Sequence, residues 1–252
     1  MIMPRVCVAI PAYNAARTLP DVVARIQQID GVDDILVVND GSRDDTAAVA
    51  AAIAARHANF HVVHHEQNAG YGRAQKTLFR ELQRLPGYGA KDTGVFLHSD
   101  GEMKPEEIPR FLVALAADDE LDCVTGSRAS HLDDPDFVRS GDRRPLWKVS
   151  ADRALTAYLN LSFGLSLSTY FGGFRALRLG AIARLPIEEL SNDHFFDIQF
   201  LACVAAFLKF REIAISNVEG HGTVTYSSMV LLRRIVAFGF RPELVPARRK
   251  AR

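Results

Sequence analysis

Residues 35–46 read ILVVNDGSRDDT, and this stretch decides the fold class. Its first four residues are apolar and mostly β-branched, which favours a buried strand. The residues that follow are polar, and an alanine-rich segment from Thr46 to Ala55 has the composition of a helix. A strand that passes through a short polar turn into a helix is the repeating unit of parallel sheets.

The same unit recurs along the first half of the chain. Apolar runs that favour strands occupy residues 6–10, 60–65, 95–99 and 123–127, and helical patterns occupy residues 18–29, 46–55 and 106–117. This alternation predicts an α/β fold with a Rossmann-like, mainly parallel sheet and helices on both faces. The second half is less regular, with a buried helix expected at 196–210 and a strand at 211–215.

Composition and charge exclude several classes of protein. Thirty basic and thirty acidic residues cancel, so no overall positive field draws the chain towards nucleic acid. Cys7, Cys123 and Cys203 stand outside any zinc spacing, and the N-terminus lacks the pattern of a signal peptide, so a cytoplasmic location is expected. The uncharged stretch 154–174 contains polar residues and glycines, which favours a helix and a loop over a membrane span.

The residues directly after each predicted strand are polar, and in such sheets ligands bind beyond the carboxyl ends of the strands. Asp40 stands at a strand tip, where a carboxylate can accept hydrogen bonds from the ribose or base of a nucleotide. Ser42 and Asp45 have the spacing of a capping box for the next helix, which is a structural alternative. The sequence lacks both GxGxxG and GxxxxGK, which disfavours NAD enzymes and P-loop hydrolases.

Six motifs follow one another in a fixed order: IPAYNAARTLP (10–20), VVNDGSRDDT (37–46), NAGYGRA (68–74), LHSDGEMKPEEIP (97–109), GSR (126–128) and GGFRALR (172–178). From Val6 to Ile215 the chain resembles the GT-A glycosyltransferases of family 2, especially the branch of polyprenyl-phosphate mannosyl- and glucosyltransferases. The resemblance implies a GT-A domain over residues 1–228. The apolar and basic residues at 229–252 predict a C-terminal helical extension on the acceptor side, a basic amphipathic helix and tail.

Carried over to this sequence, the resemblance implies a set of site residues. It assigns catalysis to Asp100, Asp197 and Arg128. It assigns contacts with the nucleotide sugar to Pro11, Ala12, Tyr13, Asn14, Asp40, Gly41, Ser42, Asn68, Gly70, Gly72, Ser99, Asp100, Arg128 and Arg153. Arg128 and Arg153 are expected to reach phosphate, and Arg175 to support the site through packing or ion pairing.

The metal motif of the family, usually Asp-x-Asp followed by Gly-Gln, corresponds here to His-Ser-Asp-Gly-Glu at 98–102. Asp100 matches the second aspartate, while His98 replaces the first and Glu102 replaces the glutamine. In an extended segment these three side chains point to the same side, so they are expected to bind a divalent metal, Mg or Mn. Imidazole suits Mn better than Mg, and a satisfied core histidine is the structural alternative for His98.

The acceptor class stays open at the level of sequence. A hydroxyl acceptor needs a general base, for which Asp193 and Asp197 are the candidates, although each can instead cap a helix. A polyprenyl phosphate, the acceptor that the resemblance implies, is already anionic and needs no base. The segments MVLLRRIVAFGF (229–240) and ARRKAR (247–252) are typical of peripheral contact with an anionic membrane or, alternatively, of a packed helix with a solvated tail.

The function that the resemblance implies is an inverting glycosyltransferase. It moves a hexose from a nucleoside diphosphate sugar, of the GDP-mannose or UDP-glucose type, to an acceptor with the help of a divalent metal. A hydroxyl of a glycan or small molecule is the alternative acceptor. Two other classes remain: a non-catalytic subunit that binds nucleotide sugars, suggested by His98, and a general α/β nucleotide-binding or nucleotidyl-transfer protein.

Overall fold

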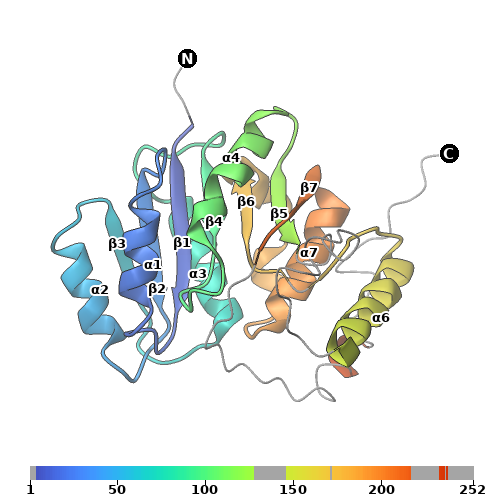
Figure 1. The fold of residues 1–252 in the computed structure, drawn as a ribbon, viewed down its shortest axis with the longest axis horizontal. Coiled ribbons are helices and arrows are strands. Elements are labelled where there is room, and N and C mark those ends of the chain that lie inside the picture. Colours follow the sequence, from blue (N-terminus) through green and yellow to red (C-terminus); the bar gives the residue numbers. More distant parts are fainter. Residues whose placement is uncertain (1–3, 128–145, 171, 217–232, 236, 238–252) are drawn as a thin grey trace.

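The computed structural model describes residues 4–127, 146–170, 172–216, 233–235 and 237. A seven-stranded sheet forms the centre of the fold (Figure 1). Its strands are β1 (Val6–Ala12), β2 (Asp34–Asn39), β3 (Phe60–His64), β4 (Thr93–Phe96), β5 (Cys123–Ser127), β6 (Arg175–Arg178) and β7 (Phe210–Ala214). The helices around it are α1 (Leu19–Ile26), α2 (Thr46–Ala54), α3 (Tyr71–Leu82), α4 (Ile108–Ala116), α6 (Leu146–Phe163) and α7 (Phe195–Phe207), with short 3-10 turns at Pro105–Glu107, Leu179–Arg184 and Ile187–Glu189.

The strands lie in the order β3-β2-β1-β4-β6-β5-β7 across the sheet. β1 pairs in parallel with β2 and β4, β2 with β3, and β5 with β7, whereas β6 runs antiparallel between β4 and β5. The predicted mainly parallel sheet is confirmed, with β6 as the reversed strand of the described sheet. Because β1 to β4 share one direction, their carboxyl ends and the loops that follow meet at one edge.

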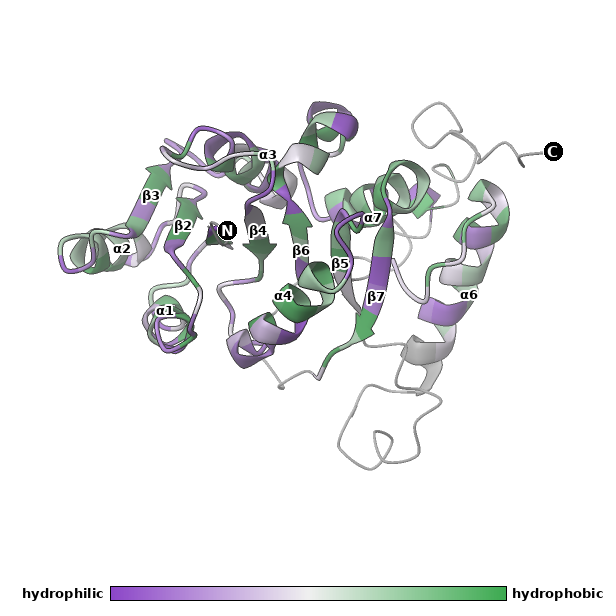
Figure 2. Ribbon diagram, turned by 90° about the horizontal axis from the view of Figure 1, so that it is seen from above, coloured by the Kyte–Doolittle hydropathy of each residue, from purple (hydrophilic) through white to green (hydrophobic). Residues whose placement is uncertain are grey.

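Helices cover both faces of this sheet (Figure 2). α1 and α4 lie on one face, and α3 and α7 lie on the other, where α6 adds Leu159 and Phe163 to the same core. Successive residues of β1 alternate between the two layers, since Val8 packs under α1 and α4 while Ala9 packs under α3 and α7. Burial on both faces explains why the strands read as continuous apolar runs.

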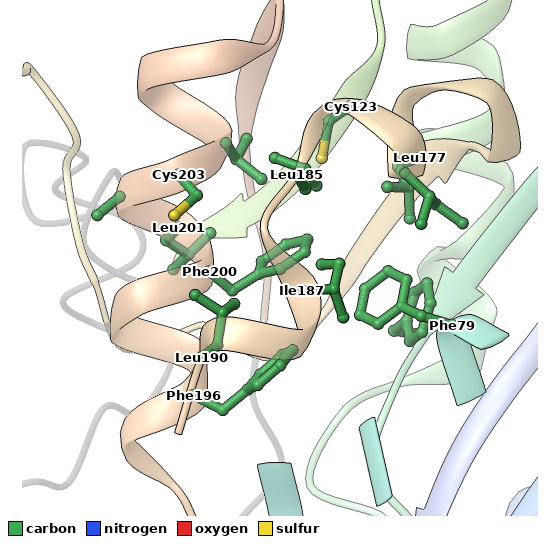
Figure 3. Close-up of a cluster of buried hydrophobic side chains, with 14 of the residues drawn as sticks. Phe79, Cys123, Leu177, Leu185, Ile187, Leu190, Phe196, Phe200, Leu201 and Cys203 are labelled. Carbon is green, nitrogen blue, oxygen red and sulfur yellow. The ribbon is translucent and has the colours of Figure 1, made fainter. Parts of the chain in front are cut away.

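Aromatic packing holds α3 and α7 together (Figure 3). The ring of Phe200 lies 5.4 Å from that of Phe79 and 5.8 Å from that of Phe196, measured between centroids. Stacked aromatic pairs of this kind contribute about 0.5–1.5 kcal/mol beyond the burial of their area. The two helices both begin at the edge where the strand ends meet, so this packing fixes the N-terminus of one against that of the other.

Most of the expected elements are confirmed, including the buried helix at 196–210, seen as α7, and the helix and loop at 154–174. No helix in the described ranges is long and apolar enough to cross a bilayer. Two elements were not expected. The start of α3 is rich in glycine, and two of the four residues of β6 are arginines, so neither segment carries the usual pattern of its element.

The predicted C-terminal helix and tail, and the boundary at residue 228, lie almost wholly outside the described residues. Residues 233–235 and 237 are helical. Ile235 is fully buried, and Arg234 forms an ion pair with Asp193 and lies 4.6 Å from the centre of the Phe195 ring. These contacts favour the packed-helix alternative for this short part of the C-terminal segment, and membrane contact by the rest stays a prediction.

Candidate active site

The loops after β1 and β2 are joined directly at the edge where the parallel strands end. The side-chain oxygen of Asn14 accepts a hydrogen bond from the backbone N–H of Arg43 at 2.8 Å, and the backbone N–H of Asn14 donates to the Ser42 hydroxyl at 2.9 Å. Asn14 has a φ of 51°, a left-handed conformation that asparagine tolerates better than most residues. The first two motifs of the predicted nucleotide site therefore form one surface.

The expected capping box of Ser42 and Asp45 is wrong. The Ser42 hydroxyl donates to the side-chain oxygen of Asn39 at 2.6 Å, and α2 begins only at Thr46, whose backbone N–H donates to Asp44 at 3.0 Å. Asp45 makes no side-chain hydrogen bond that caps the helix. Ser42 lies too far before the helix to cap it, and its hydrogen bonds serve the joined loops instead.

Asp40 is buried at the tip of β2, where it holds the third motif in place. Its carboxylate accepts hydrogen bonds from the backbone N–H groups of Ala69 and Gly70 at 3.0 and 2.9 Å. It also bonds to Nδ1 of His65 at 2.7 Å, a residue that the sequence analysis did not single out. These bonds anchor the loop before α3, while a contact between Asp40 and a nucleotide stays a prediction.

Glycines allow the loop before α3 to fit between two backbone segments. A Cβ atom at Gly41 would lie less than 3.0 Å from the backbone of Gln67, and one at Gly72 would lie less than 3.0 Å from the carbonyl oxygen of Ser191. The loop residue Asn68 accepts a hydrogen bond from the second residue after it, at 3.0 Å. The loop thus connects the tip of β2 with the segment that leads into α7.

The segment after β4 carries the predicted metal motif, but it is not extended. Gly101 has a φ of 79°, and the backbone N–H of Glu102 donates to the side chain of Asp100 at 3.0 Å, which closes a tight turn. The expected alternation of three ligands onto one side is therefore wrong. In the part of the chain that the structure describes, no group of three His, Cys, Asp or Glu residues is arranged to hold a metal ion.

Two of the three expected ligands do lie together. Nδ1 of His98 is 3.8 Å from a carboxylate oxygen of Asp100. Bonds from a divalent ion to nitrogen and oxygen are about 2.1 Å long, so one ion can span this separation. Burial acts to raise the pKa of Asp100, but the neighbouring His98 and the amide of Glu102 outweigh it and lower the pKa, which keeps the carboxylate ionised. The donor set of His98 and Asp100 fits a divalent metal.

Tyr71, a residue that the sequence analysis missed, lies at the centre of a polar cluster beside this pair. Its hydroxyl is 2.9 Å from Nε2 of His98 and donates to the carboxylate of Asp197 at 2.9 Å. Its ring stacks on that of His194, with centroids 4.8 Å apart. A Cβ atom at Gly173 would lie less than 3.0 Å from Nε2 of His98, so the GGFRALR motif lies directly against the imidazole.

Arg175 anchors this cluster from the core, as an ion-pairing support. Its side chain is fully buried, and its guanidinium donates to Asp197 at 2.7 Å and to Gln75 at 2.9 Å. The guanidinium also lies 4.1 Å from the centre of the Phe200 ring, which stacks in the aromatic core of Figure 3. The ion pair that was expected for Arg175 is confirmed.

The remaining predicted residues are spread more widely. Pro11, Ala12 and Ser99 are buried near the strand ends, and Tyr13 is 41% exposed. Arg153 is exposed on α6, and Arg128 lies outside the described residues.

The segment before α7 contains Asp193, the other candidate base. Asp193 accepts a hydrogen bond from the backbone N–H of Phe195 at 3.0 Å, but His194 is the N-cap of α7, so Asp193 lies one residue before the capping position. Its carboxylate also pairs with Arg234. Asp193 therefore serves the start of α7 and the contact with the C-terminal segment.

Comparison with known proteins agrees with this arrangement. The model of the family described as glycosyl transferase family 2 matches residues 7–185. An undecaprenyl-phosphate mannosyltransferase of Micrococcus luteus is 31% identical over 195 residues, which cover 76% of this chain and 73% of that protein. A polyprenol monophosphomannose synthase of Mycolicibacterium smegmatis is 31% identical over 194 residues, which cover 76% and 68% of the two chains.

A solved structure shares the fold. Glucosyl-3-phosphoglycerate synthase from Mycobacterium tuberculosis, in complex with Mn²⁺, UDP-glucose and phosphoglyceric acid, superimposes with a TM-score of 0.66 at 21% identity. The match covers 96% of this chain and 80% of the other. Together with the family match over most of the chain, this similarity confirms the expected GT-A fold. The chain belongs to glycosyl transferase family 2 and is a glycosyltransferase.

Proposed function

We propose that this glycosyltransferase moves a hexose from a nucleoside diphosphate sugar to a polyprenyl phosphate, with inversion at the anomeric carbon. The relatives from Micrococcus luteus and Mycolicibacterium smegmatis are named for polyprenyl-phosphate acceptors, which supports the lipid phosphate as the acceptor class. In the reaction, a phosphate oxygen of the acceptor forms a bond to the anomeric carbon. The bond from that carbon to the donor diphosphate breaks, and its electron pair leaves with the nucleoside diphosphate.

The observation that carries the choice of acceptor is the state of Asp197. One of its carboxylate oxygens accepts from Arg175 and the other accepts from Tyr71, at 2.7 and 2.9 Å. A carboxylate with both oxygens engaged in this way positions its neighbours and does not act as a general base for a hydroxyl acceptor. A phosphate acceptor is already a nucleophile and needs no base, so this arrangement favours it.

The donor is proposed to bind across the joined loops at the strand ends. The loops after β1 and β2, with Asn14 and Ser42, form the surface for the nucleoside, and the loop at Gly70 lies beside it. A divalent ion held by His98 and Asp100 would neutralise the charge that develops on the leaving diphosphate. Arg128 and Arg153 are proposed to contact phosphate groups as well.

The C-terminal tail is proposed to bring the enzyme to the cytoplasmic face of a membrane, where its acceptor lies. Residues 247–252 contain four basic side chains and no acidic one, and each such charge contributes about 1 kcal/mol near an anionic surface. Sedimentation with vesicles of neutral and of anionic lipid tests this part. Equal binding of the full chain and of a chain that ends at residue 246 would exclude a role for the tail.

A donor panel tests the proposed activity. The protein is incubated with GDP-mannose or UDP-glucose, with Mn²⁺ or Mg²⁺, and with or without undecaprenyl phosphate. We expect release of nucleoside diphosphate that depends on both the metal and the lipid phosphate. Binding of the donor without release indicates a non-catalytic subunit, release of pyrophosphate indicates nucleotidyl transfer, and turnover with a hydroxyl acceptor alone excludes the lipid phosphate.

A further inference from the structure

We propose that Tyr71 is a positioning residue that keeps the ring proton of His98 on Nε2 and so leaves the lone pair of Nδ1 free to bind a divalent ion together with Asp100. The inference rests on the proposed function for the use of that ion, but it concerns side chains whose hydrogen bonds are visible in the structure. A chain of hydrogen bonds runs from Arg175 in the core to His98 at the site.

Arg175 fixes the direction of the first bonds in this chain. A guanidinium can only donate, so the oxygen of the Gln75 amide must face Nη2 of Arg175, at 2.9 Å. This orientation turns the Gln75 amide nitrogen towards Tyr71, and it donates to the Tyr71 hydroxyl oxygen at 2.8 Å. The carboxylate of Asp197 can only accept, and it takes hydrogen bonds from Arg175 and from Tyr71.

These bonds determine whether His98 donates or accepts in its hydrogen bond with Tyr71. The Tyr71 hydroxyl has a single hydrogen, which it donates to Asp197, and its oxygen already accepts from Gln75. A contact of 2.9 Å between this oxygen and Nε2 of His98 is therefore a hydrogen bond only if Nε2 carries the proton and donates.

The consequence lies on the other side of the imidazole. With Nε2 occupied by a proton, Nδ1 is the ring nitrogen that faces Asp100, 3.8 Å from its carboxylate, and it can hold either a second proton or, when that proton leaves, a divalent ion. Two electron-rich atoms at this distance attract a cation. Partners that orient a metal-binding histidine through its second nitrogen typically change metal affinity by about 10- to 100-fold.

The neighbours of Tyr71 make a clean substitution possible. Its ring stacks on His194 with centroids 4.8 Å apart and meets His98 edge-on at 5.3 Å, so Tyr71→Phe keeps both ring contacts and removes only the hydroxyl. Tyr88→Phe is the matched control, since the Tyr88 hydroxyl donates to Asp34 at 2.7 Å, at the start of β2 and thus at the opposite end of the strands.

The test combines two measurements on the metal-free full chain. The ¹⁵N chemical shifts of the His98 ring are recorded at pH 8.5, with His98→Gln used to assign them, and Mn²⁺ binding is measured by titration calorimetry. We expect Nε2 to carry a proton in wild type and in Tyr88→Phe. In Tyr71→Phe we expect a mixture of both neutral forms and a loss of Mn²⁺ affinity of about 10- to 100-fold.

A wild-type ring whose Nε2 carries no proton would overturn the proposal without any variant. Equal Mn²⁺ affinity in wild type and Tyr71→Phe would overturn it as well. Neither measurement involves sugar transfer, so a failure of this proposal can be distinguished from a failure of the proposed function. If the ring and Mn²⁺ results are as expected but no donor is turned over, the positioning role stands and the proposed function is wrong.

Discussion

The carboxylate of Asp40 accepts a hydrogen bond from the backbone N–H of Gly70, 30 residues further along the chain, at 2.9 Å. This bond and those to Ala69 and His65 are made by a side chain that is almost fully buried. The tip of β2 therefore supports the loop that opens α3, in addition to any contact it makes with a nucleotide.

Replacing this carboxylate should affect both stability and binding. Asp40→Ala leaves the backbone N–H of Ala69 and the His65 ring without their acceptor, while Gly70 keeps only Asn68, and each unsatisfied group costs about 1–3 kcal/mol. We expect a clear fall in the free energy of unfolding in urea and weaker binding of nucleoside diphosphate even without metal. A variant with wild-type stability and affinity would show that neither role is correct.

Gly41 should be sensitive to a single added methyl group. Gly41→Ala forces a non-glycine residue to a φ of 61° and places its Cβ against the backbone of Gln67. Gly31→Ala is the matched control, because its φ is 86° but nothing lies within 4 Å of the added atom. Each variant bears a strain of about 1–2 kcal/mol, and we expect only Gly41→Ala to raise the KM for the nucleotide sugar. Equal kinetics in the two variants would exclude the steric contact as the cause.

Asp100 should be essential for transfer but not for folding. Asp100→Ala removes a ligand of the proposed divalent ion, whose effect on the transition state is worth several kcal/mol, so turnover should fall by a factor on the order of a hundred or more. Glu106→Ala serves as the control, because this exposed acid pairs with Arg25 instead. Turnover at varied Mn²⁺ and melting temperature are measured together. Near-normal turnover in Asp100→Ala would remove the residue from the site.

Glu212 should make the protein less stable as the pH rises above its ordinary titration range. Burial raises the pKa of Glu212 above 4.5 although Ser168 donates to its carboxylate. The folded state therefore favours the protonated form, and this contribution to stability is present below pH 4.5 and is lost as the pH rises through the raised pKa. Glu212→Gln should flatten the decline in unfolding free energy between pH 4.5 and pH 7, as followed by urea titration. Identical slopes would contradict the assignment.

The sequence predicts the layers of this fold well because they depend on repeating local patterns. Residues such as Val8 and Ala9 are apolar on both faces of a strand, which is visible without any knowledge of their partners. β6 lacks such an apolar pattern, because Arg175 is a charged residue whose burial depends on its ion pair with Asp197, 22 residues later. The order of the motifs predicts where the site lies, and the periodicity of the apolar residues predicts the sheet.

The details of the site depend on contacts that no local pattern encodes. Gly101 takes a left-handed conformation and turns the chain, so the even spacing from His98 to Glu102 does not bring all three side chains to one point. Tyr71 is the first residue of α3 and lies between two glycines, and its role depends on a hydrogen bond to Asp197, 126 residues away. Such residues become recognisable only when the long-range contacts are known.

Arg234 connects the C-terminal segment with the start of α7. In the structure it pairs with Asp193, in the backbone segment against which Gly72 rests. If the proposed membrane contact reached Arg234, a lipid phosphate would compete with Asp193 for this arginine. The segment that supports the loop before α3 would then lose its ion pair. By reciprocity, a bound donor that fixes the loop before α3 would then weaken such a contact of Arg234 with the lipid.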